Sequence, residues 1–259
     1  MKKEKYREYN GLFGDAIDYK VYHMTIKEIV LGAMAGAGIG AVVIMIFFNL
    51  FILTLLAIPF CGAAGILILK NMLLENRKKK LLFQFRDMLE SISASFGSGQ
   101  NVSNAFQSAL KDMQTQYGDS AYIVEELKII NHGILSNIRI EELLLDFAKR
   151  SHNENIQSFA DVFTVANKRG GDIRQVIFET KNVINEKIMV EQDIQTLISG
   201  KKNELNIMML LPLIVVNQTK AMQGNAAEDV ALNFIIKLAA FGMFAIAYVI
   251  GQKMMKIEV

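Results

Sequence analysis

The sequence predicts an all-α membrane protein in which transmembrane helical hairpins flank a cytoplasmic six-helix bundle. Three observations predict this class. Long apolar stretches occur near both ends of the chain, the stretch between them has apolar residues at helical spacing and no proline, and basic residues flank each apolar stretch. Hydrophobic residues make up 52% of the chain, which exceeds the usual share in a soluble domain and favours membrane segments.

The first predicted elements are a basic cytoplasmic leader over residues 1–28 and a transmembrane hairpin over residues 29–70. Nearly every residue between Ile29 and Leu69 is apolar or small. This length is about twice the ~20 residues that one helix needs to cross the hydrocarbon core. We therefore expect two spans, over residues 29–47 and 50–69, with Asn49 at the turn.

Basic residues set the expected orientation of this hairpin. They are frequent before and after it and absent from its turn: Lys2, Lys3, Lys5, Arg7, Lys20 and Lys27 precede it, and Lys70, Arg77, Lys78, Lys79 and Lys80 follow it. Because cytoplasmic loops are enriched in Lys and Arg, both ends of the hairpin are expected in the cytoplasm. The run Arg77–Lys80 could also bind anionic lipid headgroups or simply anchor the hairpin.

Residues 71–206 are expected to form the cytoplasmic bundle. Apolar residues recur there at the spacing of one helix face, as in Leu81, Phe85, Met88, Ile92 and Phe96. Breaks between helices are expected at residues 97–99, 117–120, 133–137, 151–153 and 170–171. Helix-start signals follow these breaks at Asn101, Ser120, the capping-box pair Ser151 and Glu154, and Asp172. This pattern predicts six helices and no sheet.

The chain is expected to end with a second hairpin over residues 207–252 and a cytoplasmic tail over residues 253–259. Residues 230–250 make a good span, although Lys237 lies inside it and is either functional or snorkels to the interface. The other span is short and polar at its end, so it needs residues 217–223 to cross. Both flanks are basic and therefore cytoplasmic by the same rule, through Lys201, Lys202, Lys253 and Lys256.

Glycines in the first span predict close helix packing. Gly32, Gly36 and Gly40 stand four residues apart. Small residues at this spacing let helix backbones approach closely in lipid. The letters from Gly36 to Ala41 also form a degenerate dinucleotide-binding fingerprint, but that motif requires a preceding strand in a βαβ unit. We therefore assign the three glycines to helix packing.

No catalytic, cofactor-binding or metal site is expected. Residues 199–202 resemble the end of a phosphate-binding loop, but Gln195 stands where that motif requires glycine. The acidic pairs Glu125–Glu126 and Glu141–Glu142 fall near helix starts, where carboxylates favour the helix dipole. The three histidines stand far apart and lack a partner at ligand spacing: His23, His132 and His152. The net charge of +2 is too small to argue for nucleic acid.

Short motifs follow the first hairpin in a definite order. They are Phe85-Arg86-Asp87-Met88-Leu89, Ser98-Gly99-x-x-Val102-x-Asn104-Ala105-Phe106, Glu141-Glu142-Leu143-Leu144-x-x-Phe147-Ala148-x-Arg150, the pair Gly170-Gly171 between two helices, and Ser199-Gly200-Lys201-Lys202 before Leu211-Pro212. In order and spacing they resemble the F-domain family of type II secretion, type IV pilus and Tad (tight adherence) pilus systems. The single copy of the domain is similar to the TadB- and TadC-like members.

This resemblance implies a platform protein without enzymatic activity in the cytoplasmic membrane. Its expected partners are a TadA-like secretion ATPase, prepilins, membrane lipids and a paralogous or identical second F-domain protein. The run Arg77–Lys80 would then contact the ATPase or lipid. A multi-pass transporter or channel subunit is the alternative, and it would need polar residues in its spans, for which Asn49, Thr54 and Lys237 are the candidates. A membrane-bound enzyme would need a catalytic constellation, and none is visible in the sequence.

Overall fold

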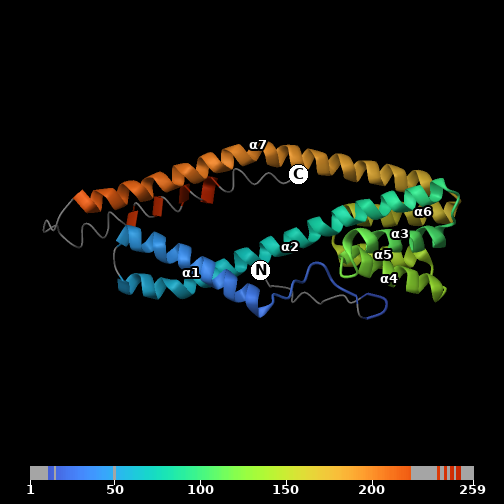
Figure 1. The fold of residues 1–259 in the computed structure, drawn as a ribbon, viewed down its shortest axis with the longest axis horizontal. Helices are drawn as coiled ribbons and strands as arrows, with labels where there is room; N and C mark the ends of the chain where they lie inside the picture. The colour runs from blue at the N-terminus through green and yellow to red at the C-terminus, as the bar shows by residue number, and fades with distance from the viewer. Residues whose placement is uncertain are drawn as a thin grey trace. The chain divides into compact units, whose positions relative to one another are not determined.

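The computed structural model describes residues 11–14, 16–48, 51–222 and, near the end of the chain, 238–239, 242–243, 246–247 and 249–251. These residues form helices and connecting segments and contain no strand, so the all-α prediction is confirmed for them. The helices are α1 Ile26–Phe48, α2 Phe51–Gly97, α3 Val102–Tyr117, α4 Tyr122–Leu135, α5 Ile140–Ser151, α6 Glu154–Arg169 and α7 Ile173–Met222 (Figure 1).

The chain divides into two compact units. The first unit contains the leader up to His23 together with Asn71–Ile188, and the second contains Met24–Lys70 and the residues from Met189 onward. Helices α2 and α7 contribute residues to both units. The predicted domain boundaries after residues 70 and 206 are therefore not helix ends. A helix satisfies its own backbone hydrogen bonds in water and in lipid alike, so a change of medium requires no break.

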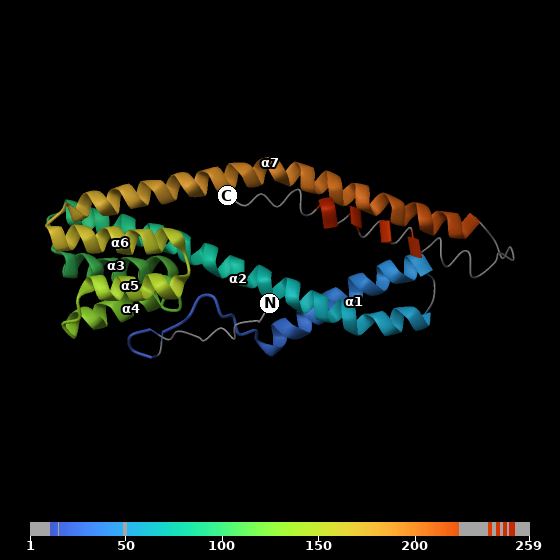
Figure 2. The same ribbon diagram turned by 180° about the vertical axis from the view of Figure 1, so that it is seen from behind.

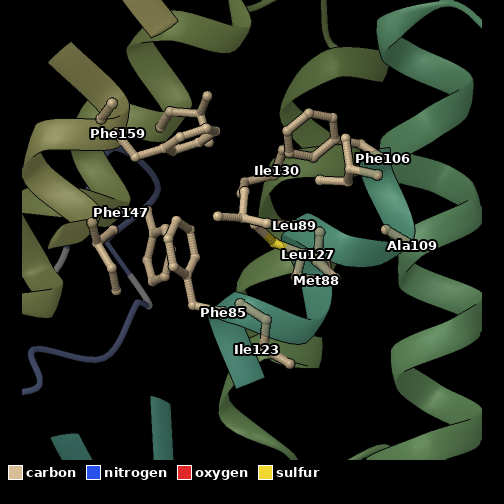
Figure 3. Close-up of a cluster of buried hydrophobic side chains, with 14 of the residues drawn as sticks. Phe85, Met88, Leu89, Phe106, Ala109, Ile123, Leu127, Ile130, Phe147 and Phe159 are labelled. Atoms are coloured by element: carbon tan, nitrogen blue, oxygen red, sulfur yellow. The ribbon is translucent and has the colours of Figure 1, made fainter. Parts of the chain in front are cut away.

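Large apolar side chains from several helices fill the first unit (Figure 3). Phe85 from α2 lies with its ring centroid 6.0 Å from that of Phe147 in α5 and 5.5 Å from that of Phe159 in α6. All three rings are buried. The residues that predicted the helical face of this part of α2 are all buried too: Leu81, Phe85, Met88, Ile92 and Phe96. Helices α3 to α6 gather around this core (Figures 1 and 2).

The predicted breaks agree with the observed ends of α2 to α6 within a few residues. Asn101 caps α3 by accepting a hydrogen bond from the backbone N–H of Asn104 at 2.8 Å. Two predicted caps are displaced, however. Ala121, not Ser120, precedes α4, and Asn153 rather than Ser151 caps α6 because its side chain accepts from the first backbone N–H groups of that helix. Ser151 instead ends α5.

The second unit contains α1 and the beginning of α2. The segments Ile26–Ile46 and Thr54–Gly97 are long and apolar enough to cross a membrane. In the most apolar 18-residue stretch of each segment, only 6% of the residues are buried within the protein. Helix α1 ends at Phe48 and α2 begins at Phe51, so the described ends agree with the two predicted spans. Asn49, the predicted turn residue, lies outside the described residues.

The predicted closing hairpin is described only in part. Helix α7 runs without interruption through residues 207–222, including the position of Pro212. The described residues from Leu238 to Gly251 are helical wherever they are placed. Lys237 and most of the predicted last span lie outside the described residues, as does the tail of residues 253–259.

Candidate functional site

A buried cluster of charged side chains is the most distinctive polar feature of the first unit. Arg150, in the last turn of α5, has a side chain only 1% exposed. Its Nη1 and Nη2 donate to the two carboxylate oxygens of Glu126 in α4, each at 2.6 Å. Its Nε donates to Oδ2 of Asp146 at 2.9 Å, one helical turn earlier in α5. The bidentate pair of Arg150 with Glu126 joins α5 to α4 within the core, and Asp146 supplies a second carboxylate to the same guanidinium.

Tyr19 of the leader completes this cluster. Its hydroxyl donates to Oε1 of Glu126 at 2.9 Å, and its backbone N–H donates to the carbonyl of Arg150 at 2.9 Å. Its ring is fully buried and packs edge-on against Tyr122, with the ring centroids 5.8 Å apart. We call residues 16–23 the strap, and we call Tyr19, Glu126, Asp146 and Arg150 the ion cluster. The strap belongs to the coil drawn in dark blue beside the green and yellow helices (Figure 2).

Burial and charge pull the protonation equilibria of the ion cluster in opposite directions. Burial raises the pKa of the Glu126 carboxyl, and the bonds from Arg150 and Tyr19 oppose this shift. Burial alone would lower the pKa of Arg150, but the bonds and charges of Glu126 and Asp146 outweigh it and raise the pKa. Burial, together with Glu126, also raises the pKa of Tyr19. Arg150 therefore stays cationic, and with its side chain enclosed the cluster suits a structural clasp better than acid–base chemistry.

A second ionic contact lies next to the ion cluster. Nε2 of His152 is 2.9 Å from Oδ1 of Asp18 in the strap. The same Asp18 oxygen accepts the backbone N–H of Lys20 at 2.9 Å, which shapes a turn within the strap. His152, the residue that follows α5, adopts the left-handed conformation, with φ at 48°. The strap is thus fixed to the end of α5 at Ile17, Asp18 and Tyr19.

The predicted basic run Arg77–Lys80 divides between the interior and the surface. Arg77 is only 9% exposed, and its guanidinium carbon lies 4.9 Å from the ring centroid of Tyr19 and 5.3 Å from that of Tyr122. Its Nη1 donates to the carbonyl of Val21 in the strap at 3.1 Å. Arg77 therefore does not lie on the predicted lipid or ATPase contact surface, because its aromatic surroundings hold it inward. Lys78 is half-buried, and Lys79 and Lys80 are exposed.

The predicted glycines of α1 lie where that helix meets α2. A Cβ added at Gly36 would come within 2.4 Å of the carbonyl oxygen of Cys61 and 2.8 Å of the Cα of Gly65. A Cβ at Gly65 would come within 2.4 Å of the carbonyl oxygen of Gly32, and one at Gly40 within 2.4 Å of Sγ of Cys61. The two helices therefore contact through their backbones along this row, as small residues allow in lipid.

The remaining motif residues lie at helix ends and in the core. Gly170 ends α6 in the left-handed conformation with φ at 69°, and Gly171 packs against Ala166 of the same helix. Ala105 in α3 is fully buried, and Gly99, with φ at 83°, lies in the turn before α3. These positions serve the geometry of the unit, and they do not converge with Arg150 on one site.

Sequence reasoning missed most members of the ion cluster, although a signal was present. Glu126 stands among Ile123, Leu127 and Ile130 on the buried face of α4, and Arg150 follows Leu143 and Phe147 on the buried face of α5. Charged residues at core-facing positions are rare unless they are paired. Opposite charges at such positions on neighbouring helices thus indicate a buried pair. Nothing comparable in the sequence marks Asp18 and Tyr19 as its partners.

Among the described residues, no group of three or more His, Cys, Asp or Glu side chains is placed to hold a metal ion. No protein-family model, curated protein or solved structure matches the chain.

Proposed function

We propose that the protein is a platform component of a Tad/type IV pilus-like or type II secretion-like machine, coupling a cytoplasmic secretion ATPase to the assembly of prepilins in the cytoplasmic membrane. The observation that carries the proposal is α2, which runs unbroken for 47 residues from an apolar, membrane-compatible segment to the core of the first unit. One helix therefore contributes both to a candidate span and to a packed helical unit.

The uninterrupted helix suits a part that transmits movement. No glycine or proline occurs between Gly65 and Gly97, so this part of α2 lacks the residues at which sharp kinks usually form, whereas Pro59 and Gly62 lie nearer its beginning. Force applied to its last turns therefore passes along a continuous series of hydrogen bonds as far as Gly65, with no hinge on the way. Helix α7 is a second helix shared by both units; it is 50 residues long and has Gly200 and Pro212 inside it.

The ordered motifs that resemble the F-domain family support the same proposal. Arg150, at the end of the Glu141–Arg150 motif, anchors the ion cluster, and the pair Gly170-Gly171 separates α6 from α7. The first motif thus supplies the cation of the buried ion cluster, and the second supplies the glycine that ends α6 in the left-handed conformation. In this proposal the partners are a TadA-like ATPase, prepilins, membrane lipids and a second F-domain protein, paralogous or identical, and both termini are cytoplasmic.

The exposed lysines of α2 form the proposed contact with the ATPase or with anionic lipid. Within the run Arg77–Lys80, the proposal assigns this contact to Lys79 and Lys80 alone. Arg77 is enclosed by tyrosines, and Lys78 is half-buried. An electrostatic contact of this kind weakens as salt rises, since exposed charges are screened within about 8 Å at physiological ionic strength.

The experiment that tests the proposal measures binding of the secretion ATPase encoded beside this protein to the full chain in lipid nanodiscs. We expect binding that weakens at least several-fold in the charge-reversal variant Lys79→Glu/Lys80→Glu. The matched control is Lys149→Glu, which reverses an exposed charge on α5. No binding by the unaltered protein, or solute flux through it in proteoliposomes, would contradict the proposal and favour the transporter alternative.

Reporter fusions test the proposed topology separately. Fusions at Asn49, Ser120 and Gly224 are expected to report outside, inside and outside. An inside result at Gly224 would remove the closing hairpin from the proposal.

A further inference from the structure

We propose that Arg77 is a latent binding site for a phosphate group, and that the second half of the strap covers this site until it is displaced. The phosphate group is either free in solution or part of a lipid headgroup. This inference goes beyond the proposed function and does not depend on the binding of an ATPase. It rests on contacts within the first unit, to which both Arg77 and the strap belong.

Two buried arginines of the first unit differ in their partners. Arg150 donates to the carboxylates of Glu126 and Asp146. Arg77 forms no ion pair with a carboxylate of the described residues, and its Nη1 donates to the backbone carbonyl of Val21 at 3.1 Å. Its Nε is buried and has no hydrogen-bond partner in the part of the chain that the structure describes. A buried cation with an unsatisfied donor is costly, so Arg77 favours an incoming anion where Arg150 already has two.

The strap supplies most of the groups that surround Arg77. The guanidinium carbon lies 4.9 Å from the ring centroid of Tyr19, 5.3 Å from that of Tyr122 and 6.0 Å from that of Tyr22. Tyr19 and Tyr22 belong to the strap, as does the carbonyl of Val21, whereas Tyr122 belongs to α4. Ring faces attract a cation but carry no net charge. The strap therefore covers Arg77 without neutralising it.

The two halves of the strap differ in burial. Asp18 is 1% exposed and Tyr19 is 0% exposed, and both are fixed to the end of α5. Of residues 20–23, which we call the flap, two are exposed and two are only half-buried. Segments with few buried contacts open locally at a low cost in free energy. The flap can therefore lift from Arg77 while Tyr19 stays in place.

A phosphate group satisfies the guanidinium of Arg77 better than the flap does. Two N–H groups of an arginine donate to one phosphate in parallel, whereas the carbonyl of Val21 accepts from Nη1 alone. Nearby lysines favour the high charge of phosphate over that of a carboxylate. Lys78 is the next residue, with part of its charge offset by Glu75 at 3.9 Å, and Lys80 lies one turn farther along α2. Phosphate and the flap therefore compete for the same guanidinium.

Nuclear magnetic resonance of the arginine Nε–H groups tests the site in the full chain. The protein is held in nanodiscs of phosphatidylcholine, and the Arg77 signal is identified as the one that is lost in Arg77→Lys. We expect this signal to move when inorganic phosphate is added, because its Nε gains an acceptor. The signal of Arg150, whose Nε already has an acceptor, should not move. Sodium chloride at the same ionic strength is the control and should move neither signal.

The lipid composition of the nanodiscs separates the two sources of phosphate. Movement of the Arg77 signal on addition of inorganic phosphate identifies free phosphate as a ligand. Movement in nanodiscs that contain phosphatidylglycerol, without added phosphate, identifies an anionic lipid headgroup as a ligand. Absence of movement under both conditions overturns the proposal. Because no ATPase is present, this result leaves the proposed platform function untouched.

Displacement of the flap is measured by hydrogen exchange. Binding of phosphate should speed exchange of the Val21 amide, whereas the Tyr19 amide, which donates to the carbonyl of Arg150, should keep its rate. Tyr22→Ala removes one ring from the cover and should lower the dissociation constant for phosphate about two- to fivefold, the equivalent of one cation–π contact. The matched control is His23→Ala, at an exposed position of the flap, which should leave the constant unchanged.

Substitution of Arg77 itself completes the test. Arg77→Gln should abolish the effect of phosphate on the Val21 amide. Arg86→Gln, at an arginine of α2 that already pairs with Asp87, should preserve this effect. Exchange in α3 shows whether each variant is folded, and the resonance experiment on the unaltered chain decides alone if a variant is not. Phosphate binding that leaves the Val21 amide unchanged, or that survives in Arg77→Gln, overturns the proposal.

Discussion

The two parts of α2 pack by different rules. Near its beginning the helix exposes large apolar side chains, with Ile52 82% exposed and Phe60 76% exposed. Near its end Phe85, Met88 and Leu89 are completely buried. Both parts carry large apolar residues, but the second also carries charged ones such as Lys79, Lys80 and Glu90 on its exposed face. The second part buries its apolar residues against other helices, whereas the first leaves them open to a surrounding that we assign to lipid.

Helix contacts in the two units differ in the same way. In the first unit, aromatic rings from α2, α5 and α6 fill the space between helices. In the hairpin, Gly36 of α1 and Gly65 of α2 bring the backbones together without side chains. Burial of large side chains stabilises helices in water, but lipid removes that driving force and leaves van der Waals packing at close approach. Truncation of a large side chain should therefore cost much in the first unit and little in the hairpin, where added volume at a glycine should cost more.

Truncation of one aromatic side chain in each part of α2 should give the largest difference. Phe85→Ala removes a ring from the core and is expected to lower the free energy of unfolding of the first unit by about 3–5 kcal/mol. Phe60→Ala, on the exposed part, should leave it within about 0.5 kcal/mol. Pulse proteolysis in urea on nanodisc-held protein measures both. Equal losses would show that Phe60 also belongs to a packed core.

Loss of one partner of the buried ion pair ranks next. Arg150→Met leaves Glu126 and Asp146 buried without their cation and should cost about 3–5 kcal/mol. The double variant Arg150→Met/Glu126→Leu removes both charges of the bidentate pair and should recover part of that loss, because apolar replacements of a buried pair are often neutral. The same urea assay applies. A double variant as unstable as the sum of the single variants would mean that the charges contribute independently.

Addition of one methyl group in the hairpin distinguishes close contact from open space. Gly36→Ala places a Cβ against the backbone of α2 and should weaken the packing of α1 on α2 by about 1–3 kcal/mol. Gly38→Ala, two residues along the same helix, meets nothing within 4 Å and is the matched control. Spin labels on the two helices would report the separation. Similar distances in the two variants would contradict the glycine contact.

Alkaline pH should produce the smallest effect, in the first unit. Burial, with the hydrogen bond to Asp87, raises the pKa of Tyr117 to about 12. The folded chain thus holds this proton more tightly than the unfolded chain, where the tyrosine pKa is about 10. Its contribution to stability is complete below pH ~10 and is lost as the pH rises through ~12. Tyr117→Phe should flatten this part of the stability profile, and parallel profiles would contradict the assignment.

The sequence predicted the elements of the first unit well because its helices follow periodic rules. The buried face of α2 from Leu81 to Phe96 and the turn at Gly170–Gly171 both follow from local patterns. The displaced cap at Asn153 shows the limit of such patterns, since neighbouring polar residues compete for the same backbone N–H groups, and α4 begins after Ala121 with no side-chain cap.

The role of the leader could not be predicted from local sequence. Tyr19 and Arg150 are far apart in the chain, and their contact depends on how α4 and α5 pack. The basic composition of the leader predicts a cytoplasmic segment, and it gives no sign that Asp18 and Tyr19 are buried. The sequence likewise places Arg77 in one basic run with Lys78, Lys79 and Lys80, because local sequence does not reveal the tyrosines that enclose it.

Cysteine labelling along α2 and at the preceding turn tests the central claim most directly, namely that one helix passes from the membrane to a cytoplasmic unit. Single cysteines at Asn49, Phe60 and Lys80, in a Cys61→Ala background, are treated in spheroplasts with a maleimide that does not cross membranes. We expect labelling of Asn49→Cys in intact spheroplasts, labelling of Lys80→Cys only after permeabilisation, and none of Phe60→Cys in either state. Labelling of Phe60→Cys from water, or of Lys80→Cys in intact spheroplasts, would contradict the account.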